Sequence, residues 1–235
     1  MKLVIGIVAC LHGNELLGKH VIELLKKVSL RRGAFSFILA NKEAMRQNKR
    51  FIHTDLNRCF PGSEKGNHEE RLAAELMKQL EKCDYVIDIH STTADTENFV
   101  VITKNQARKL AFSAPLKKLV IMQKAIAGNK SLIDNVNCGI SIEFNRKTKA
   151  GHVKEIVLKT IENLIKGKQV KKEVYSVYGM KKKDKRDIQL TNFKKTTLDK
   201  EAFYPVLFGE KEYKDFLCLK AELIPEQINK STFYQ

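Results

Sequence analysis

The chain has 235 residues, 43% of them hydrophobic, and fits one large domain or a domain of about 150–170 residues with a smaller appendage. The composition excludes a membrane-spanning helix, because no apolar run approaches the roughly 18 residues that such a helix needs. Five cysteines without a C-x-x-C pair argue against a disulfide framework and a cysteine zinc site, so we expect a reduced, cytoplasmic protein.

The net charge of +16 is concentrated in part in a lysine-rich stretch from Lys166 to Arg186. Such a stretch can bind nucleic acid or another anionic surface, and it can equally be a solvated face. We favour the solvated face, because the sequence has no basic repeats interleaved with aromatic residues, as base stacking requires. A small anionic substrate is also consistent with the charge.

The first predicted strand, Leu3 to Cys10, is an almost unbroken apolar run and leads directly into Leu11-His12-Gly13-Asn14-Glu15. An amphipathic helix is predicted to follow over Leu16 to Val28. The end of a buried strand is a crevice position, and it places the imidazole of His12 and the carboxylate of Glu15 on one turn. These two groups are half of a metal site.

Beyond this helix, apolar strands alternate with helical patterns. Strands are predicted over Phe35–Ala40, Tyr85–Ile89, Phe99–Thr103, Leu119–Met122 and Cys138–Phe144, and helices over Asn41–Asn48, His68–Lys82, Gln106–Phe112 and Gly151–Ile165. This alternation indicates an α/β fold with a mixed, mostly parallel central sheet flanked by helices. Phe51–Asn67 and Gly128–Asn137 are predicted loops, and a loop as long as the first is often functional.

The predicted strand over Tyr85–Ile89 is followed directly by His90, much as the first strand is followed by Leu11 and His12. Two strand ends that carry His12, Glu15 and His90 predict a three-ligand zinc site with an open fourth position. Asp88 is a candidate to orient one of the ligands. The alternative is a pair of hydrogen-bonded histidines, and these residues alone do not separate the two interpretations.

Two other His-x-x-Glu pairs, His20/Glu23 and His152/Glu155, occur in the chain. Both fall in amphipathic helical patterns, where polar residues three apart usually form a solvated face. We therefore expect neither pair to bind a metal.

Two further stretches carry candidate chemistry. Arg50, Asn57 and Arg58 lie around the long loop, where two guanidinium groups and an amide can bind an anion. Glu143 is a lone carboxylate within an apolar strand, and burying it without a partner would be costly. Glu143 is therefore either half of a buried salt bridge or chemically employed.

The pattern changes past Gly167. Short apolar segments separated by polar turns are predicted as strands around Val170–Val177, Ile188–Leu190, Tyr204–Phe208 and Phe216–Leu219. We place a boundary there, between a domain at residues 1–167 and a small β-rich C-terminal subdomain at residues 168–235.

Four motifs, taken in order, resemble the succinylglutamate desuccinylase/aspartoacylase family, a branch of the zinc-carboxypeptidase-like fold. They are His-Gly-Asn-Glu at 12–15, Arg50 with Asp-Leu-Asn-Arg-x-Phe-Pro-Gly at 55–62, Asp-Ile-His-Ser-Thr-Thr at 88–93, and Ile-Glu-Phe at 142–144. The resemblance spans about residues 3–145, with a weaker similarity from Tyr204 to Tyr213.

The resemblance implies one zinc ion per chain and a role for each of eight residues. In these roles the zinc ligands are His12, Glu15 and His90, the catalytic base is Glu143, the oxyanion-binding group is Arg50, and the substrate-binding residues are Asn57, Arg58 and Tyr213. The implied chemistry agrees with the residues, because zinc, a carboxylate and a guanidinium together can activate water and stabilise the developing charge.

The chain departs from the family pattern in that it is short and Gly128–Asn137 holds no arginine where aspartoacylases carry a substrate-binding one. We expect a zinc-dependent hydrolase that cleaves the amide bond of an anionic N-acyl amino acid or a similar small carboxylate-bearing amide. The alternatives are a carboxypeptidase-like metallopeptidase acting on short peptides and a non-catalytic basic binding protein on the same fold. The sequence does not determine the oligomeric state, and a homo-oligomer is one possibility.

Overall fold

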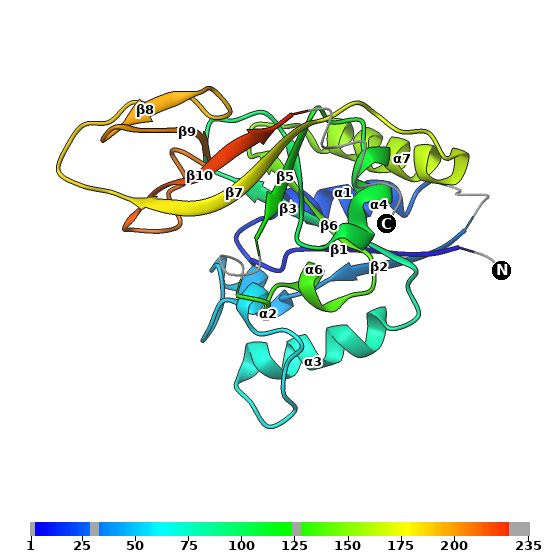
Figure 1. The fold of residues 1–235 in the computed structure, drawn as a ribbon. Coiled ribbons are helices and arrows are strands. Elements are labelled where there is room, and N and C mark those ends of the chain that lie inside the picture. Colours follow the sequence, from blue (N-terminus) through cyan, green and yellow to red (C-terminus); the bar gives the residue numbers. More distant parts are fainter. Residues whose placement is uncertain (1–2, 29–32, 124–127, 226–235) are drawn as a thin grey trace.

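The computed structural model describes residues 3–28, 33–123 and 128–225. Within them a ten-stranded sheet runs in the order β2-β1-β3-β6-β4-β5-β7-β10-β9-β8 (Figure 1). The strands are β1 (Val4–Ala9), β2 (Ala34–Leu39), β3 (Tyr85–Thr92), β4 (Phe99–Ile102), β5 (Lys118–Met122), β6 (Gly139–Asn145), β7 (Glu173–Lys182), β8 (Thr196–Leu198), β9 (Glu201–Val206) and β10 (Phe216–Ile224).

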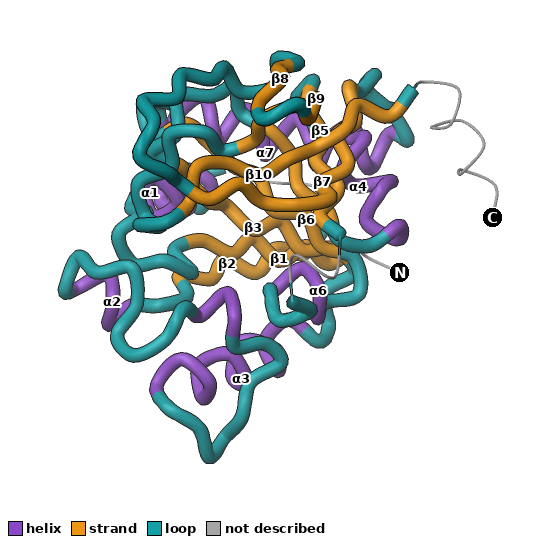
Figure 2. The backbone as a smooth tube through the Cα atoms, turned by 60° about the vertical axis from the view of Figure 1, so that its left-hand side comes forward, coloured by secondary structure: helices purple, strands orange, loops and turns teal. Residues whose placement is uncertain are grey.

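The helices lie on both faces of this sheet (Figure 2). They are α1 (Leu17–Leu25), α2 (Lys42–Arg46), α3 (His68–Leu80), α4 (Arg108–Ser113), α6 (Leu132–Asn135) and α7 (Ala150–Lys166), with short 3₁₀ turns η1 (Leu56–Arg58) and η2 (Asn105–Ala107). One apolar core joins α1, α4 and α7 to the sheet, and a second joins α3 and α6 to the opposite face. The α/β class with flanking helices is therefore confirmed.

The sheet is mixed. β2, β1, β3 and β6 run parallel to one another, β4 runs antiparallel to β6, and β5 and β7 run parallel to β4. Because β1, β3 and β6 are parallel, their carboxyl ends meet at one edge, where open α/β sheets usually bind ligands. Strands β10, β9 and β8 complete the sheet in antiparallel pairs.

The C-terminal strands extend the same sheet. β7 pairs with β5 in parallel register, and β7 and β10 form a long antiparallel ribbon that continues the sheet towards β9 and β8 (Figure 1). The segment after Gly167 is therefore β-rich, as expected, although the division into two domains at residue 167 stays a prediction. Residues 226–235 of the predicted subdomain lie outside the described residues.

Several predicted boundaries differ from those observed. The loop predicted over Phe51–Asn67 contains η1, and the loop over Gly128–Asn137 contains α6, whose first turn is held by a capping box between Ser131 and Asp134. Ile188 and Leu190 lie in irregular chain instead of a strand, and the short strand β8 was not predicted. These are short elements that tertiary contacts stabilise, so they leave little periodicity in the sequence.

The described part of the chain contains no helix that is both long and apolar enough to span a bilayer. The five cysteines are unpaired in this structure.

Candidate active site

The turn after β1 brings the first motif to the edge of the sheet. Cys10 adopts a left-handed conformation with φ of 60°, and the chain then passes close beneath α2. A Cβ atom at Gly13 would lie 2.3 Å from the backbone of Ala44, so only glycine fits this approach. The next residues place His12 and Glu15 beside the end of β3, where His90 lies.

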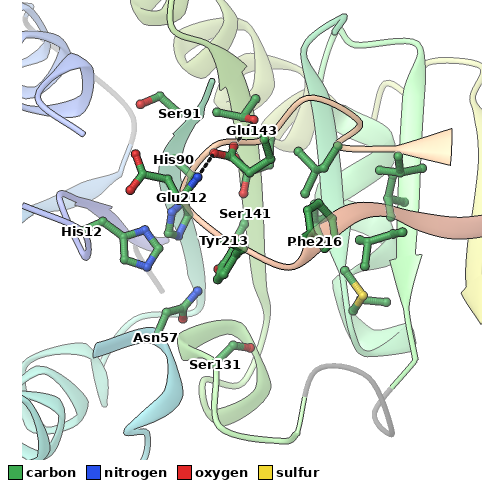
Figure 3. Close-up of a pocket in the computed structure, with 18 of the residues that line it drawn as sticks. His12, Asn57, His90, Ser91, Ser131, Ser141, Glu143, Glu212, Tyr213 and Phe216 are labelled. Carbon is green, nitrogen blue, oxygen red and sulfur yellow. Dashed lines mark hydrogen bonds between the residues drawn. The ribbon is translucent and has the colours of Figure 1, made fainter. Parts of the chain in front are cut away.

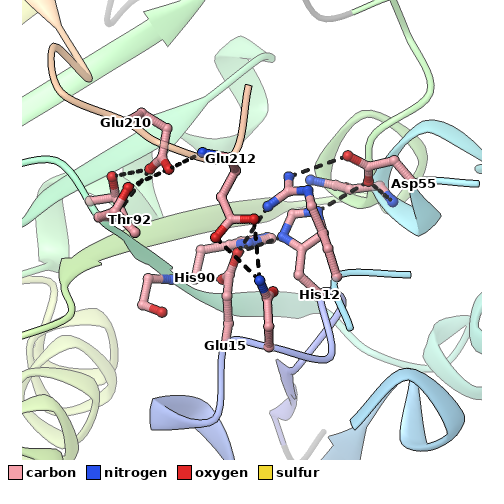
Figure 4. Close-up of polar contacts among 12 residues, drawn as sticks. His12, Glu15, Asp55, His90, Thr92, Glu210 and Glu212 are labelled. Atoms are coloured by element: carbon pink, nitrogen blue, oxygen red, sulfur yellow. Dashed lines mark hydrogen bonds and ion pairs between the residues drawn. The ribbon is translucent and has the colours of Figure 1, made fainter. Parts of the chain in front are cut away.

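His12, Glu15 and His90 form the buried cluster that was predicted as a metal site (Figure 4). Glu15 lies between the rings, with Oε1 2.6 Å from His12 Nδ1 and Oε2 3.2 Å from His90 Nδ1. Ser91 N–H donates to Glu15 Oε2 at 2.8 Å and fixes the carboxylate. The three residues present one ligand atom each within 4.8 Å of one another, so they could hold a metal ion.

The second nitrogen of each histidine is held by another carboxylate. His12 Nε2 lies 3.0 Å from Asp55 Oδ1, and His90 Nε2 lies 2.6 Å from Asp88 Oδ2. A carboxylate on the outer nitrogen fixes the tautomer and ring orientation of a metal-ligating histidine and raises its basicity. The donor set and its supporting carboxylates therefore fit zinc, and Asp88 occupies the supporting position proposed from the sequence.

The electrostatics of this cluster favour a positive charge at its centre. Burial acts to lower the pKa of His12 and His90, but the surrounding carboxylates outweigh it and the pKa of both histidines is raised. Burial acts to raise the pKa of Glu15, and the two histidines outweigh it, so the pKa is well below its usual value. The same field that attracts protons would attract a metal cation.

Glu143 projects from β6 into the cavity beside the cluster (Figure 3). It is level with His90 in the register of β3 and β6. Burial raises the pKa of Glu143 to about 7, and the two nearby histidines only partly oppose this rise. Among the described residues Glu143 forms no salt bridge, so the interpretation as half of a buried ion pair is not supported.

The guanidinium group of Arg50 lies at the same cavity and is fixed from three sides. It donates to Asp55 Oδ2 at 3.2 Å and to the Tyr213 hydroxyl at 2.9 Å, and contacts Glu15 Oε1 at 3.5 Å. The guanidinium carbon also lies 5.1 Å from the centre of the Tyr213 ring. Tyr213, predicted from a weak similarity, thus lies in the site despite its distance in sequence.

Asn57 and Arg58 also line the cavity. Asp55 caps η1 by accepting from Asn57 N–H, and Asn57 Oδ1 accepts from Leu132 N–H at 2.9 Å. That bond occupies the amide oxygen of Asn57, so the group that Asn57 can offer to a ligand is its NH₂ donor. The Arg58 side chain is exposed, with one guanidinium nitrogen on the Asn57 carbonyl.

A buried carboxylate on α3 holds the long loop in place. Glu69 is fully buried and accepts from Ile52, His53 and Thr54 N–H groups, in addition to the amide of Asn41. Burial raises its pKa, but these donors outweigh burial and lower it. The loop with Arg50 and Asp55 is therefore anchored by a helix that contributes nothing to the cavity itself.

A C-terminal loop between β9 and β10 fastens onto the strand ends (Figure 4). Glu210 accepts from the Thr92 and Thr93 hydroxyls and from Thr93 N–H, and Glu212 accepts from Asn14 and Arg146. Because Tyr213 also accepts a hydrogen bond from Arg50, this loop contacts three of the four motifs: the one at residues 12–15, the one that begins at Arg50 and the one at residues 88–93.

All eight predicted site residues thus lie at one cavity. The two other His-x-x-Glu pairs do not join it: His152 and Glu155 are exposed on α7, with nitrogen and oxygen 3.7 Å apart, and His20 is exposed on α1. Sequence reasoning gave no role to Asp55, although it stands in the quoted Asp-Leu-Asn-Arg motif. Nothing local could have identified Glu69 or Glu210, because both act through residues distant in sequence.

Comparison with known proteins places these motifs in a family. Residues 3–146 match the profile described as the succinylglutamate desuccinylase/aspartoacylase catalytic domain. A probable aspartoacylase of Acaryochloris marina is 31% identical over an alignment of 126 residues, and the match covers 47% of this chain and 42% of the relative. The N-acyl-aromatic-L-amino acid amidohydrolase (carboxylate-forming) B of Danio rerio is 30% identical over an alignment of 111 residues, and the match covers 38% of this chain and 35% of the relative.

The match to these curated relatives thus covers less than half of their length. Among solved structures, murine aminoacylase 3 superimposes with a TM-score of 0.79 over 94% of this chain and 95% of its own, at 18% identity. That likeness shows a shared fold, including the C-terminal strands. From the profile match and the four motifs, the chain belongs to the succinylglutamate desuccinylase/aspartoacylase family.

Proposed function

We propose that this protein is a zinc-dependent hydrolase that cleaves the amide bond of an N-acyl amino acid or a similar small carboxylate-bearing amide. The observation that carries the proposal is the cluster of His12, Glu15 and His90, with a carboxylate on the outer nitrogen of each histidine. Membership of the family and the names of the relatives support the same activity.

Zinc held by His12, Glu15 and His90 would act as a Lewis acid and lower the pKa of water to about 7. Glu143 is the proposed base. It accepts a proton from the attacking water and passes it to the leaving amine. A pKa raised by burial to about 7 suits a group that must both take and release a proton near neutral pH.

Arg50 is the proposed partner of the negative charge that develops on the carbonyl oxygen. Its guanidinium is held in position by Asp55 and Tyr213, so it would reorganise little during the reaction. Groups fixed in advance where charge develops commonly contribute about 10²–10³-fold to turnover.

Asn57 and Arg58 are the proposed site for the substrate carboxylate. The amide NH₂ of Asn57 and the planar fork of Arg58 are both donors that match a carboxylate. This arrangement makes a carboxylate-bearing amide a better candidate than a neutral one.

The test measures zinc content and turnover of the purified protein on N-acyl amino acids and on short peptides. We expect about one zinc per chain and faster hydrolysis of N-acyl amino acids. Faster hydrolysis of peptides would instead indicate a metallopeptidase. Full zinc content with no turnover on either set would indicate a non-catalytic binding protein.

A further inference from the structure

The cavity that holds the metal cluster extends well beyond it. Its volume is about 600 Å³, and its far part, which we call the apolar chamber, is walled by Val101, Val120, Met122, Met180, Phe216 and Leu219. Figure 3 shows one of them, Phe216, beyond Glu143 and Tyr213, on the side away from His12. They belong to β4, β5, β7 and β10, so both halves of the chain build the chamber.

The apolar chamber begins at the proposed base. In the register of β6 and β4, Glu143 is level with Phe99, and Ser141 is level with Val101. Val101 is in turn level with Val120 on β5. Since alternate residues of neighbouring strands share a face of the sheet, the face that presents the base continues directly into an apolar wall.

Most charged side chains that line the cavity belong to the metal cluster and to the loops that carry Arg50, Arg58, Glu210 and Glu212. Three more charged residues, Lys182, Lys214 and Asp215, line the cavity near Phe216, and all three are exposed. Met180 is an apolar wall residue that is nevertheless 51% exposed. An apolar pocket of this size with few convergent polar groups is typical of a site for an apolar ligand group.

We propose that the amide substrate carries a bulky apolar group, aromatic or aliphatic, that fills the apolar chamber while its carboxylate lies at Asn57 and Arg58. This inference rests on the proposed function and narrows its substrate class. The apolar group can belong to the acyl part or to the side chain of the amino acid, and both place the same chemistry in the chamber. Each buried methylene should improve recognition roughly fourfold.

The first experiment measures kcat/KM of the zinc-loaded full chain on two series of substrates. One series joins acetyl to aspartate, alanine, leucine or phenylalanine, and the other joins acetyl, butanoyl, hexanoyl or phenylacetyl to alanine. We expect one series to rise at least tenfold from its smallest to its largest apolar member. The highest value on N-acetylaspartate, with both apolar series flat or falling, would overturn the inference and leave the hydrolase standing.

A binding measurement separates this inference from the proposed activity. Calorimetry compares 3-phenylpropanoate with succinate on the zinc-loaded protein, and no turnover is needed. We expect 3-phenylpropanoate to bind at least tenfold more tightly. If nothing is hydrolysed but this preference holds, the proposed function fails and the apolar chamber stands. If 3-phenylpropanoate binds as weakly as succinate or more weakly, the inference that the chamber binds an apolar group is overturned.

A matched pair of variants locates the binding. Met180→Glu places a carboxylate in the chamber wall, and Leu223→Glu makes the same change at an exposed residue of β10 that does not line the cavity. Both positions are exposed, so both variants should fold, which circular dichroism verifies. Met180→Glu should weaken 3-phenylpropanoate binding at least tenfold, and Leu223→Glu should change it less than twofold. Equal effects in the two variants would contradict the placement.

Discussion

The two ends of the cavity are built in opposite ways. At one end, which we call the metal end after the ion that it is proposed to hold, His12, Glu15 and His90 are buried polar groups whose ring nitrogens and carboxylate oxygens each have a partner. In the apolar chamber, the walls are aliphatic and aromatic side chains that pack loosely enough to leave a cavity. Each buried polar atom at the metal end needs a partner at a defined position, because an unpaired buried charge is costly. The chamber needs only volume and apolar surface, so it can vary with the substrate.

This comparison predicts that changes at the metal end abolish chemistry and changes in the chamber alter selectivity. The largest effect is expected at a ligand. His90→Ala removes one of the three proposed zinc ligands, so zinc content should fall from about one per chain to a level below detection by metal analysis. His152→Ala is the control, since that histidine is exposed on α7 beside Glu155 and does not line the cavity, and the variant should keep its zinc. Full zinc in a His12→Ala/His90→Ala double variant would contradict the ligand assignment.

The base should give the next largest effect. Glu143→Gln keeps the shape and removes the basicity, so kcat should fall by about 10²–10⁴-fold, the usual value of general acid–base catalysis. Zinc content and 3-phenylpropanoate binding should persist, because the amide remains at the chamber entrance. Activity within a few-fold of the original would show that another residue is the base.

A smaller effect is expected where the substrate carboxylate binds. Arg58→Lys keeps the charge and loses the planar fork, so KM should rise by the equivalent of roughly 1.5–3 kcal/mol with kcat less affected. A substrate with an amide in place of the carboxylate is the control, and the variant should lose little more on it. An equal loss of turnover on both substrates would assign Arg58 to the oxyanion instead.

Changes in the loop between β9 and β10, which carries Glu210, should affect the stability of the fold more than catalysis. Burial acts to raise the pKa of Glu210, but the Thr92 and Thr93 donors outweigh it and lower the pKa. The carboxylate therefore stabilises the fold above its unfolded pKa of about 4.5, and this contribution is lost as pH falls through the lower folded value. Glu210→Gln should reduce the free energy of unfolding at pH 7 by about 1–3 kcal/mol.

Urea denaturation at several pH values measures this effect. The difference in the free energy of unfolding between the original protein and Glu210→Gln should become smaller as the pH falls below about 4.5. Glu155→Gln, at an exposed position of α7, should stay within about 0.5 kcal/mol throughout. A gap at pH 7 no larger than that of Glu155→Gln would show that Glu210 does not fasten the loop.

The sequence by itself predicted the residues that gather at the metal end. His12 and Glu15 lie on one turn, and His90 directly follows an apolar strand pattern. Glu143 is conspicuous because a carboxylate within an apolar strand is costly to bury without a partner or a chemical role. The alternation of strands and helices likewise predicted the α/β class and most elements. In each of these cases the physical cause acts between neighbours in the chain, so it leaves a visible pattern.

Only the tertiary structure decided the rest. Asp55 meets His12 across 43 residues, and Glu210 meets Thr92 across 118, so no local pattern marks either pair. The apolar chamber is harder still to read, because Val101 or Leu219 looks like any core residue until the sheet register shows an unfilled space beside it. Burial and cavity volume are properties of the packed strands together, and the sequence alone does not contain them in readable form.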